Sequence, residues 1–575
     1  MKLFQQLLVA PAALGLLASG ANAADLNINS VSNYADTEEQ VTSINQFSDV
    51  YPTDWAYQAL ANLIERYGCV AGYPNGTFRG NRAMTRYEAA ALLNACLDRI
   101  TEITDELRRL IKEFEKELAI IRGRVDGLEA RVGELEATQF STTTKLKGKA
   151  TFVLGATKAK GDNPKYGIYE NGVDKDGNTK YLGLRRGYNR FYGATTFSYD
   201  HRLGLKTSFT GKDLLFTRLR TGNMDNTPWE GEGVNLTKID TAGASDNFVT
   251  IDRLYYRFPL GSNFTVIAGP LLRNTEMMGY KANVYGKGGQ KLLDFFGGSL
   301  GVPGVWNKET GAGFGAIYRS THEKGDPYWT VAANYVSDEG EAANSNSMDG
   351  GFMTDQGEGN ITAQIAYGSK SWGLAAGYRY GQCDVKFRSG TQYVAANKWH
   401  QGCWTNDVVD GEIQDYKVRT GADSNSWSFS AFWRPEESGW VPSISASVGA
   451  SYLNGDFKAA KQAWKEYDKR SDRRGNGIAN EFGSWAVMLQ WSDVFLMGND
   501  LGFAVGQPQF VTSTDGHGTP DDGNYAMELW YQFQVTDNIA ITPGIFWLSR
   551  PWGEFTKSDK SVGVFGGLVQ TVFKF

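Results

Sequence analysis

The last fifteen residues, 561–575, read SVGVFGGLVQTVFKF. Four large apolar side chains recur there at odd-numbered positions: Phe565, Val569, Phe573 and Phe575. Successive side chains of a β-strand point to opposite faces, so these four share one face of a strand that ends on an aromatic residue. A soluble β-sandwich can end this way, but aromatic residues at strand ends are typical of outer-membrane β-barrels. The C-terminus therefore predicts the closing strand of a membrane barrel.

From Lys145 onward the sequence shows the same period of two. The clearest strand-length runs, bounded by Gly, Asp, Asn or Pro, are 248–258, 361–367, 427–433, 525–533 and 539–547. About 17 such runs can be counted, and merging 192–199 with 203–210 into one irregular strand gives about 16. An even number is needed if both ends of the barrel face the periplasm. An 18-stranded barrel is the alternative.

The connections between these runs fall into two classes. Short turns are expected at Gly261-Ser262, Ser369-Lys370 and Asp537-Asn538. Long connections are expected near 158–189, 222–247, 270–312, 381–425 and 453–483. Short periplasmic turns and long outer loops are the usual asymmetry of an outer-membrane barrel. We therefore predict a mainly β fold, with a 16-stranded antiparallel transmembrane β-barrel over residues 141–575.

Composition divides the chain near residue 140. Glycine accounts for 68 of the 575 residues and aromatic residues for 13%, whereas apolar residues reach only 41%. Residues 1–140 hold 13 Lys and Arg against 19 Asp and Glu, and the rest holds 45 of each. A balanced stretch rich in glycine and aromatic residues lacks the basic face that nucleic-acid binding requires. We expect no nucleic-acid partner.

The first 23 residues are typical of a secretory signal peptide. Lys2 precedes an apolar core from Leu7 to Leu17, and Ala21-Asn22-Ala23 forms a small-x-small cleavage site. A buried first helix is the alternative. Beyond residue 24 no stretch approaches the ~20 apolar residues of a membrane-spanning helix, so a membrane-embedded chain must form a closed barrel. Residues 24–45 are expected to be a linker.

Residues 46–100 carry an ordered set of short motifs. These are Phe-Ser-Asp-Val at 47–50, Trp-Ala at 55–56, Gly-Tyr-Pro-Asn-Gly-Thr-Phe at 72–78 and Thr-Arg-Tyr-Glu at 85–88. The apolar spacing after residue 56 predicts a helix, and Thr85 and Glu88 have capping-box spacing for a second. The segment closely resembles a single S-layer homology domain, a helix-loop-helix module. That resemblance implies binding to peptidoglycan or to a polysaccharide linked to it.

Four residues of this module are candidates for contact with the wall polymer. Arg86 can form a bidentate pair with an anionic group, and Trp55 or Tyr73 can stack on a sugar ring. Asp49 completes the predicted set. Two alternatives stay open: Trp55 is a core residue, or Arg86 pairs with Glu88 or Asp49.

Residues 101–138 contain a heptad pattern. Its seam consists of Leu107, Ile111, Phe114, Leu118, Ile121, Val125, Leu128, Val132 and Leu135, spaced alternately by four and three. Three g-to-e pairs between neighbouring chains are opposite in sign, which favours a parallel homomeric coiled coil. One amphipathic helix lying on its own protein is the alternative. The mixture of apolar residues does not fix the number of strands.

The four cysteines fall two and two on either side of residue 140. In an exported chain they can oxidise, and we predict local disulfides Cys69–Cys96 and Cys383–Cys403, with free buried thiols as the alternative. Neither the cysteines nor the four scattered histidines have metal-ligand spacing. We also find no clustered His, Asp and Ser set and no phosphate-binding loop. The sequence therefore predicts no metal, no cofactor and no enzyme.

Two segments of the barrel region carry a further resemblance. Ser208-Phe-Thr-Gly-Lys-Asp213 followed by Thr217-Arg-Leu-Arg-Thr-Gly-Asn223 resembles an early strand pair of the carbohydrate-selective porin family. With the single S-layer homology domain and the coiled coil, the whole chain is similar to cyanobacterial outer-membrane porins. That resemblance implies a homotrimer of 16-stranded barrels among outer-membrane lipids.

Charged residues on the early strands are candidates for the pore lining. By alternation Arg218 and Arg220 share one strand face, and Arg253 and Arg257 share another. An arginine facing lipid near the midplane costs about 2–4 kcal/mol, so these should face the lumen. The connection 270–312 is the candidate for an inward-folded constriction loop that supplies Glu276 and Asp294. The alternative leaves this loop outside with its acids solvated.

Together these features predict a passive outer-membrane channel for small hydrophilic solutes and inorganic ions. The resemblances leave sugars and ions, including iron, as alternative solutes. They also imply that the periplasmic segment ties the outer membrane to peptidoglycan. A structural tether whose barrel is plugged is the alternative function.

Overall fold

A computed structural model gives the fold of the chain. It describes residues 43–54, 57–66, 68–70, 77–78, 89, 92–93, 96, 112–116 and 119, and residues 143–575 except 165–168, 174, 176–178, 287–290, 347–349, 355, 383–384, 386, 396–403, 410–411, 420–422, 438, 456–477, 516–518 and 557–559. The chain divides into two compact units, 1–139 and 140–575.

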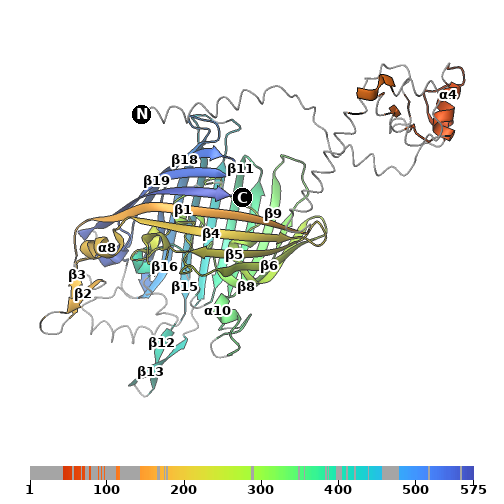
Figure 1. Cartoon of the computed structure of the whole chain (residues 1–575). Helices are drawn as coiled ribbons and strands as arrows, with labels where there is room; N and C mark the ends of the chain where they lie inside the picture. Colours follow the sequence, from red (N-terminus) through yellow and green to blue (C-terminus); the bar gives the residue numbers. More distant parts are fainter. Residues whose placement is uncertain are drawn as a thin grey trace, which may run out of the picture. The chain divides into compact units, whose positions relative to one another are not determined.

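Sixteen antiparallel strands of the second unit close into one barrel (Figure 1). They are β1 (Thr144–Gly161), β4 (Thr196–Thr207), β5 (Leu214–Gly222), β6 (Thr250–Leu260), β7 (Phe264–Arg273), β8 (Thr310–Arg319), β9 (Tyr328–Val336), β10 (Asn360–Gly368), β11 (Trp372–Gly381), β14 (Asp423–Trp433), β15 (Ser443–Asn454), β16 (Ile478–Ser492), β17 (Asp500–Asp515), β18 (Ala526–Thr536), β19 (Ile539–Leu548) and β20 (Val562–Lys574). The prediction of 16 strands is confirmed, with β4 as the merged strand, and the 18-strand alternative is wrong.

Closure of the barrel joins the two ends of this unit. β1 pairs with β20 from Lys149↔Lys574 to Gly161↔Val562. Gly148 and Phe575 exchange main-chain hydrogen bonds, so the terminal aromatic residue lies at the seam between the first and last strands. Both ends therefore lie on one side of the barrel, as expected for an even number of strands.

Turn lengths follow the predicted asymmetry. Three residues at most separate β6 from β7, β10 from β11 and β18 from β19, all on the side that holds the two chain ends. The other side carries the long connections 162–195, 223–249, 274–309, 382–422 and 455–477. A further long connection, 337–359 with the helical turn α10 (Glu339–Ala342), was not anticipated from the sequence.

Two β-hairpins lie within the long connections. β2 (Tyr169–Val173) pairs with β3 (Thr179–Leu182), and β12 (Trp404–Val409) pairs with β13 (Glu412–Arg419). Figure 1 shows both away from the barrel wall. The short helices α8 (Leu184–Tyr192) and α11 (Gln392–Ala395) also belong to these connections. None of the helices in the described part of the chain is both long and apolar enough to cross a membrane.

Side chains alternate between the two faces along most of the barrel strands. On β14, Ser424, Ser426 and Ser428 are buried inside the barrel, whereas Trp427 and Phe429 point outward and are 52% and 62% exposed. A soluble core would bury the aromatic residues and leave the serines outside. The inverted pattern is that of a wall between lipid and a polar interior.

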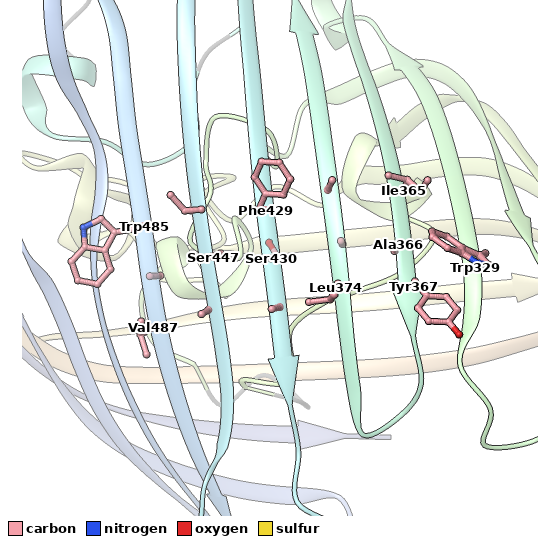
Figure 2. Close-up of a pocket in the computed structure, with 16 residues that line it drawn as sticks. Trp329, Ile365, Ala366, Tyr367, Leu374, Phe429, Ser430, Ser447, Trp485 and Val487 are labelled. Atoms are coloured by element: carbon pink, nitrogen blue, oxygen red, sulfur yellow. The ribbon is translucent and has the colours of Figure 1, made fainter.

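The outer face of six neighbouring strands, β9–β11 and β14–β16, is hollowed. Figure 2 shows this groove of about 740 Å³, which is lined by apolar side chains that include Trp329, Ile365, Leu374, Phe429 and Trp485. No polar partner is needed on such a surface in a bilayer, because lipid chains solvate it. Contact with lipid thus explains why large aromatic side chains are exposed, and no larger hydrophobic core is needed to bury them.

The first unit is described only in part. It contains η1 (Ile44–Gln46), α4 (Tyr57–Ala61) and one π-helical turn, η2 (Asn62–Arg66). Leu60 and Ile64 are buried against Cys69 and Cys96, and these two cysteines form the predicted disulfide, with an S–S distance of 2.12 Å.

Several sequence-based predictions fall outside the described residues. They concern the signal peptide 1–23, Trp55, Tyr73, Arg86, the pair Cys383–Cys403, and all of the heptad seam except Phe114.

The alternation makes a testable prediction about stability in the membrane. Val448 points outward from the middle of β15, and Val535 points outward one residue from the end of β18. Val448→Arg should destabilise the barrel by about 2–4 kcal/mol and Val535→Arg by about 0–1 kcal/mol, because the cost of a charge depends on its depth in the bilayer. Urea unfolding in lipid vesicles measures both. Equal costs would contradict the assigned depths.

Candidate functional site

The connection between β7 and β8, residues 274–309, is folded into the barrel. It begins with η5 (Asn274–Met277) and contains α9 (Asp294–Gly297). Its residues bond to side chains of β10, β15, β16 and β18. β18 is seven strands from β7 in one direction and eight from β8 in the other, so it lies opposite them. A segment that reaches the opposite wall must cross the lumen, as predicted for the 270–312 connection.

Side chains of the wall satisfy the main chain of this crossing segment. Gln364 of β10 both accepts from Tyr280 N (3.0 Å) and donates to Tyr280 O (2.9 Å). The remaining anchors are Ser445 to Val284 N (3.0 Å), Gln490 to Gly286 N (2.8 Å), Glu528 to Leu293 N (2.7 Å), Ser447 to Leu300 O (2.8 Å) and Arg379 to Gly304 O. Buried main-chain groups without partners are costly, which explains why the inner face is rich in Ser and Gln.

An apolar cluster fills the lumen beside β16–β20 and β1. From the crossing segment, Leu292, Leu293, Phe295 and Phe296 are all almost fully buried. The wall residues in the same cluster are Val153, Met488, Ala504, Trp530, Phe546, Leu548, Val562, Val564 and Leu568. Each large apolar side chain contributes roughly 1.5–3 kcal/mol when buried, so this contact holds the segment firmly against that part of the wall.

The connection 223–249 pairs with the crossing segment. It contains η3 (Pro228–Glu230) and η4 (Asn235–Thr237), and its Ile239 forms an antiparallel bridge with Leu293. Asp240 N donates to Leu292 O and Asp294 N donates to Lys238 O, each at 2.9 Å. The two connections therefore act as one layer inside the barrel.

Buried ion pairs join this layer to a third connection. Asp294 contacts Arg388 at 2.7 Å and Lys308 at 2.5 Å, and Lys308 also contacts Asp240 at 2.9 Å. Burial opposes ionisation of Asp294, but the nearby Arg388 guanidinium and Lys308 ammonium outweigh it and hold the pKa of that carboxyl below its usual range. Asp294 is thus a structural anion in a paired cluster.

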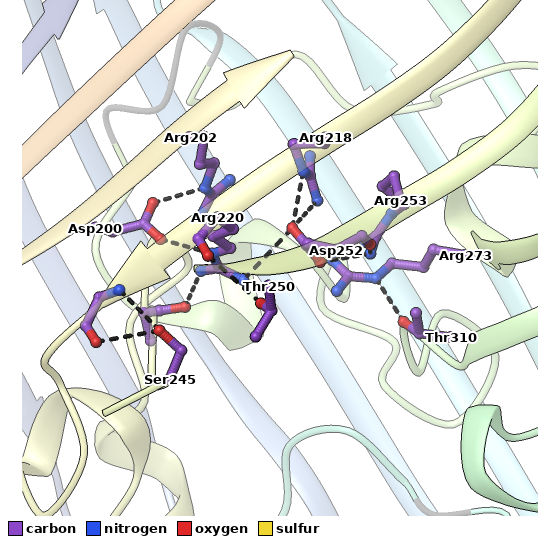
Figure 3. Close-up of polar contacts among 12 residues, drawn as sticks. Asp200, Arg202, Arg218, Arg220, Ser245, Thr250, Asp252, Arg253, Arg273 and Thr310 are labelled. Atoms are coloured by element: carbon purple, nitrogen blue, oxygen red, sulfur yellow. Dashed lines mark hydrogen bonds and ion pairs between the residues drawn. The ribbon is translucent and has the colours of Figure 1, made fainter. Parts of the chain in front are cut away.

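The opposite part of the wall, β4–β7, carries a row of arginines. Figure 3 shows Arg202, Arg218, Arg220, Arg253 and Arg273 along it. Two aspartates are interleaved with them. Asp200 contacts Arg202 and Arg220, both at 2.6 Å. Asp252 contacts Arg218 at 2.5 Å and Arg253 at 2.7 Å.

Within this row the arginines differ in exposure. The side chains of Arg202, Arg218 and Arg220 keep 21%, 17% and 18% of their surface exposed, whereas Arg253 is completely buried. Arg253 also donates to Glu276 at 2.6 Å. A cavity of about 260 Å³ adjoins Arg220, Thr250, Asp252, Thr310 and Glu339.

The residues predicted from the sequence are therefore only partly brought together. Arg218, Arg220 and Arg253 lie in one row, and the predicted acid Glu276 contacts Arg253 directly. Arg257 lies four residues farther along β6 towards the short turn and is exposed. Asp294 pairs elsewhere, with Lys308 and Arg388. The acids of the crossing segment consequently do not form a separate acidic surface facing the arginines.

Sequence reasoning missed Asp200, Arg202 and Asp252. Alternation along β4 could have found Asp200 and Arg202, which share a strand face with Gly204. It could not have found Asp252, because this residue lies at a β-bulge opposite Arg218 and Leu219. Counting every second residue fails at a bulge.

In the N-terminal unit the structure shows one of the four wall-binding candidates. The Asp49 carboxylate accepts a hydrogen bond from Phe78 N at 2.6 Å. This bond ties the turn after η1 to the segment near Phe78. Asp49 therefore has a structural contact, and its contact with a wall polymer stays a prediction.

Residues 297–301 have the spacing Gly-x-Ser-x-Gly, which in hydrolases presents a nucleophilic serine at a strand-to-helix turn. Here Ser299 is completely buried and follows the helical turn α9 rather than a strand. The motif lacks its structural context. Among the described residues, no group of three His, Cys, Asp or Glu side chains is arranged to hold a metal ion.

Comparison with known proteins places the chain in a family. The profile of the carbohydrate-selective porin, OprB family, matches residues 104–575, and the S-layer homology domain profile matches residues 46–90. The chain belongs to the OprB porin family. Its match covers the whole barrel, and family and fold together point to an outer-membrane channel rather than an enzyme.

Some relatives of this porin match most of its length and others only a short part of it. An uncharacterized protein of Nostoc sp. is 33% identical over 94% of this chain and 86% of the relative, and one of Synechocystis sp. is 30% identical over 92% and 91%. Outer membrane protein SlpA of Deinococcus radiodurans is 39% identical over 14% of this chain and 8% of its own. The solved structure of Pseudomonas putida OprB covers 77% of this chain and 96% of its own at 11% identity, with a TM-score of 0.43.

A buried carboxylate ties three elements together on the long-loop side of the porin. Asp522 accepts hydrogen bonds from Thr391 Oγ1 (2.8 and 2.9 Å), Val511 N (2.8 Å) and Glu554 N (3.0 Å). The neighbouring Gly553 has a φ of 59°, and a Cβ there would lie 1.7 Å from Asp522 Oδ1. Burial raises the pKa of Asp522 to about 7, against the lowering effect of these hydrogen bonds.

This raised pKa predicts a pH-dependent stability of the outer loops. The folded state holds the proton up to about pH 7 and the unfolded state only to about pH 4, so the stabilisation is full below pH 4 and is lost as pH rises through 7. The loss is at most about 4 kcal/mol. Asp522→Asn should abolish this part of the pH dependence. Hydrogen exchange of the Val511 and Glu554 amides between pH 4 and 8 measures it, and an unchanged profile in the variant would contradict the assignment.

Proposed function

We propose that this porin is a passive diffusion channel whose solute path follows the β4–β7 wall past the arginine row. One observation carries the proposal: Arg202, Arg218 and Arg220 keep about a fifth of their surface exposed inside a closed barrel. The β16–β20 side, in contrast, is occupied by the apolar cluster. Water and solutes therefore have access to the arginines from the lumen.

The proposed solutes are small hydrophilic molecules and inorganic ions. The arginines outnumber the interleaved carboxylates, and a basic constriction favours anions. The family name supports sugars as solutes. The small volume of the cavity beside Arg220 supports solutes of small cross-section.

We also propose that the segment before the barrel ties the outer membrane to peptidoglycan. The match to the S-layer homology domain supports this role for residues 46–100. The heptad seam supports a parallel homomeric coiled coil over 101–138, and the resemblance to cyanobacterial outer-membrane porins supports three chains in the assembly. A single wall-binding module per chain binds more firmly when several chains are joined.

A structural tether with a plugged barrel is the second candidate. The observation in its favour is the extent of the apolar cluster, in which side chains of four connections pack against six strands. Reconstitution in planar lipid bilayers separates the two functions. Conductance steps without an energy source support the channel, and their absence supports the plugged tether.

Charge reversal tests the proposed path. Arg218→Glu should shift ion selectivity toward cations, because it replaces a partly exposed positive charge with a negative one beside Asp252. Arg253→Glu should act in the same direction through the field of a buried charge. The reversal potential under a salt gradient measures both, and Arg218→Gln should give an intermediate value. An unchanged reversal potential would contradict the lumenal path.

Deletion of residues 25–140 tests whether the barrel alone conducts and whether the first unit binds the wall. The shortened porin should keep its single-channel conductance, because the barrel closes through β1 and β20 without the deleted residues. It should lose co-sedimentation with peptidoglycan sacculi. Retained sedimentation would show that the barrel itself binds the wall, and lost conductance in correctly inserted barrels would show that the first unit belongs to the channel.

A further inference from the structure

Glu528 is a buried acid on the lumenal face of β18 with an unusual set of partners. Its side chain is 1% exposed. Oε2 accepts from Leu293 N at 2.7 Å, and Oε1 accepts from the Tyr285 hydroxyl at 2.8 Å. The Tyr285 oxygen in turn accepts from Trp530 Nε1 at 2.7 Å. Leu292 N also donates to Oε1, at 3.5 Å, so three residues of the crossing segment are bound by one carboxyl group.

Glu528 lies on the part of the barrel wall opposite the two ends of the crossing segment. The crossing segment leaves the wall at β7 and returns to it at β8, and β18 stands opposite both. Anchors on β10, such as Gln364, hold the segment near its origin, whereas Glu528 holds it at the far wall. At the far wall this polar contact acts together with the apolar packing of Phe295 and Phe296, and both keep the segment across the lumen.

The chemistry of Glu528 also differs from that of the other anchors. Among the described residues, the other wall side chains that bind the main chain of the crossing segment between Tyr280 and Gly304 are Ser, Gln and Arg. A carboxyl group can accept two hydrogen bonds at once, and when ionised it accepts them with about twice the strength of a neutral acceptor. Its removal leaves the Leu293 amide and the Tyr285 hydroxyl without this partner in an apolar surrounding.

We propose that Glu528, with Tyr285 and Trp530, is the positioning residue that holds the crossing segment over the lumen and thereby sets the width of the channel. This inference rests on the proposed channel function. The segment is held at the far wall, and what remains for solutes is the strip beside the arginine row. Loss of the Glu528 contact leaves the apolar packing as the remaining hold at the β18 wall, so the segment leaves that wall more often and the path widens.

Single-channel recording of the full-length protein in planar bilayers tests the proposal. Glu528→Ala should raise the occupancy of a higher conductance level roughly 30-fold above its occupancy in the native channel, for the loss of the two short hydrogen bonds. Glu528→Gln, which keeps one acceptor oxygen, should lie closer to the native channel. Tyr285→Phe should raise the occupancy less than Glu528→Ala. Leu529→Ala, a change at the outward-facing neighbour, is the matched control and should conduct like the native channel.

A reversible cross-link separates movement of the segment from damage to the barrel. Ile239 and Leu293 face each other without direct main-chain bonds between them, flanked by the bonds Asp240 N to Leu292 O and Asp294 N to Lys238 O. Such pairs have Cα atoms about 4.5 Å apart, within disulfide range. In the Glu528→Ala background, Ile239→Cys with Leu293→Cys should restore the native conductance when oxidised and lose it when reduced.

The outcomes distinguish this inference from the function on which it rests. If the native protein does not conduct, the channel function itself fails. If it conducts and Glu528→Ala has the native conductance, the proposed positioning role of Glu528 is contradicted. If Glu528→Ala is wider but oxidation of the cysteine pair does not narrow it, the change comes from the barrel wall rather than from the crossing segment, and the proposal is overturned as well.

Discussion

The requirement that every main-chain polar group find a partner within the chain governs this structure. Lipid offers no hydrogen bonds, so a sheet that crosses a bilayer must have no free edge. The pairing of β1 with β20, down to the bonds between Gly148 and Phe575, removes the last edge. Once the sheet is closed, alternation leaves only two environments for a side chain. Contact with lipid determines which residues suit the outer face. The groups that occupy the lumen determine which residues suit the inner face.

The same requirement applies again inside the barrel. The crossing segment 274–309 has little secondary structure of its own, so its amides and carbonyls need other partners. Gln364, Ser445 and Gln490 provide them from the wall. The polar character of the inner face is therefore matched to a peptide chain and not simply to water. Where the segment is apolar, at Phe295 and Phe296, the facing wall is apolar too. The lumen is a packed interior on one side and a charged surface on the other.

The sequence predicts the parts of this arrangement that depend on local periodicity. The number of strands, the sidedness of the turns and the inward course of the 270–312 connection all follow from alternation and connection length. The partners of the charged residues do not follow, because they join distant parts of the chain: Asp294 pairs with Arg388, 94 residues away. Alternation does not predict that Asp252 joins the arginine row, because this residue lies at a β-bulge. The anchoring role of Glu528 cannot be predicted from local periodicity either, because its partners lie more than 230 residues earlier in the chain.

The aspartates within the arginine row bear on how such a surface can conduct. A row of unpaired arginines in a narrow, weakly polar lumen would attract an anion strongly, but conduction also requires that the ion leave. Asp200 and Asp252 each contact two arginines, so the positive charge is spread along the row with no deep minimum at one residue. They also reduce the repulsion among guanidinium groups that are fixed on adjacent strands. In the proposed channel, this partial compensation keeps the binding of a passing ion shallow.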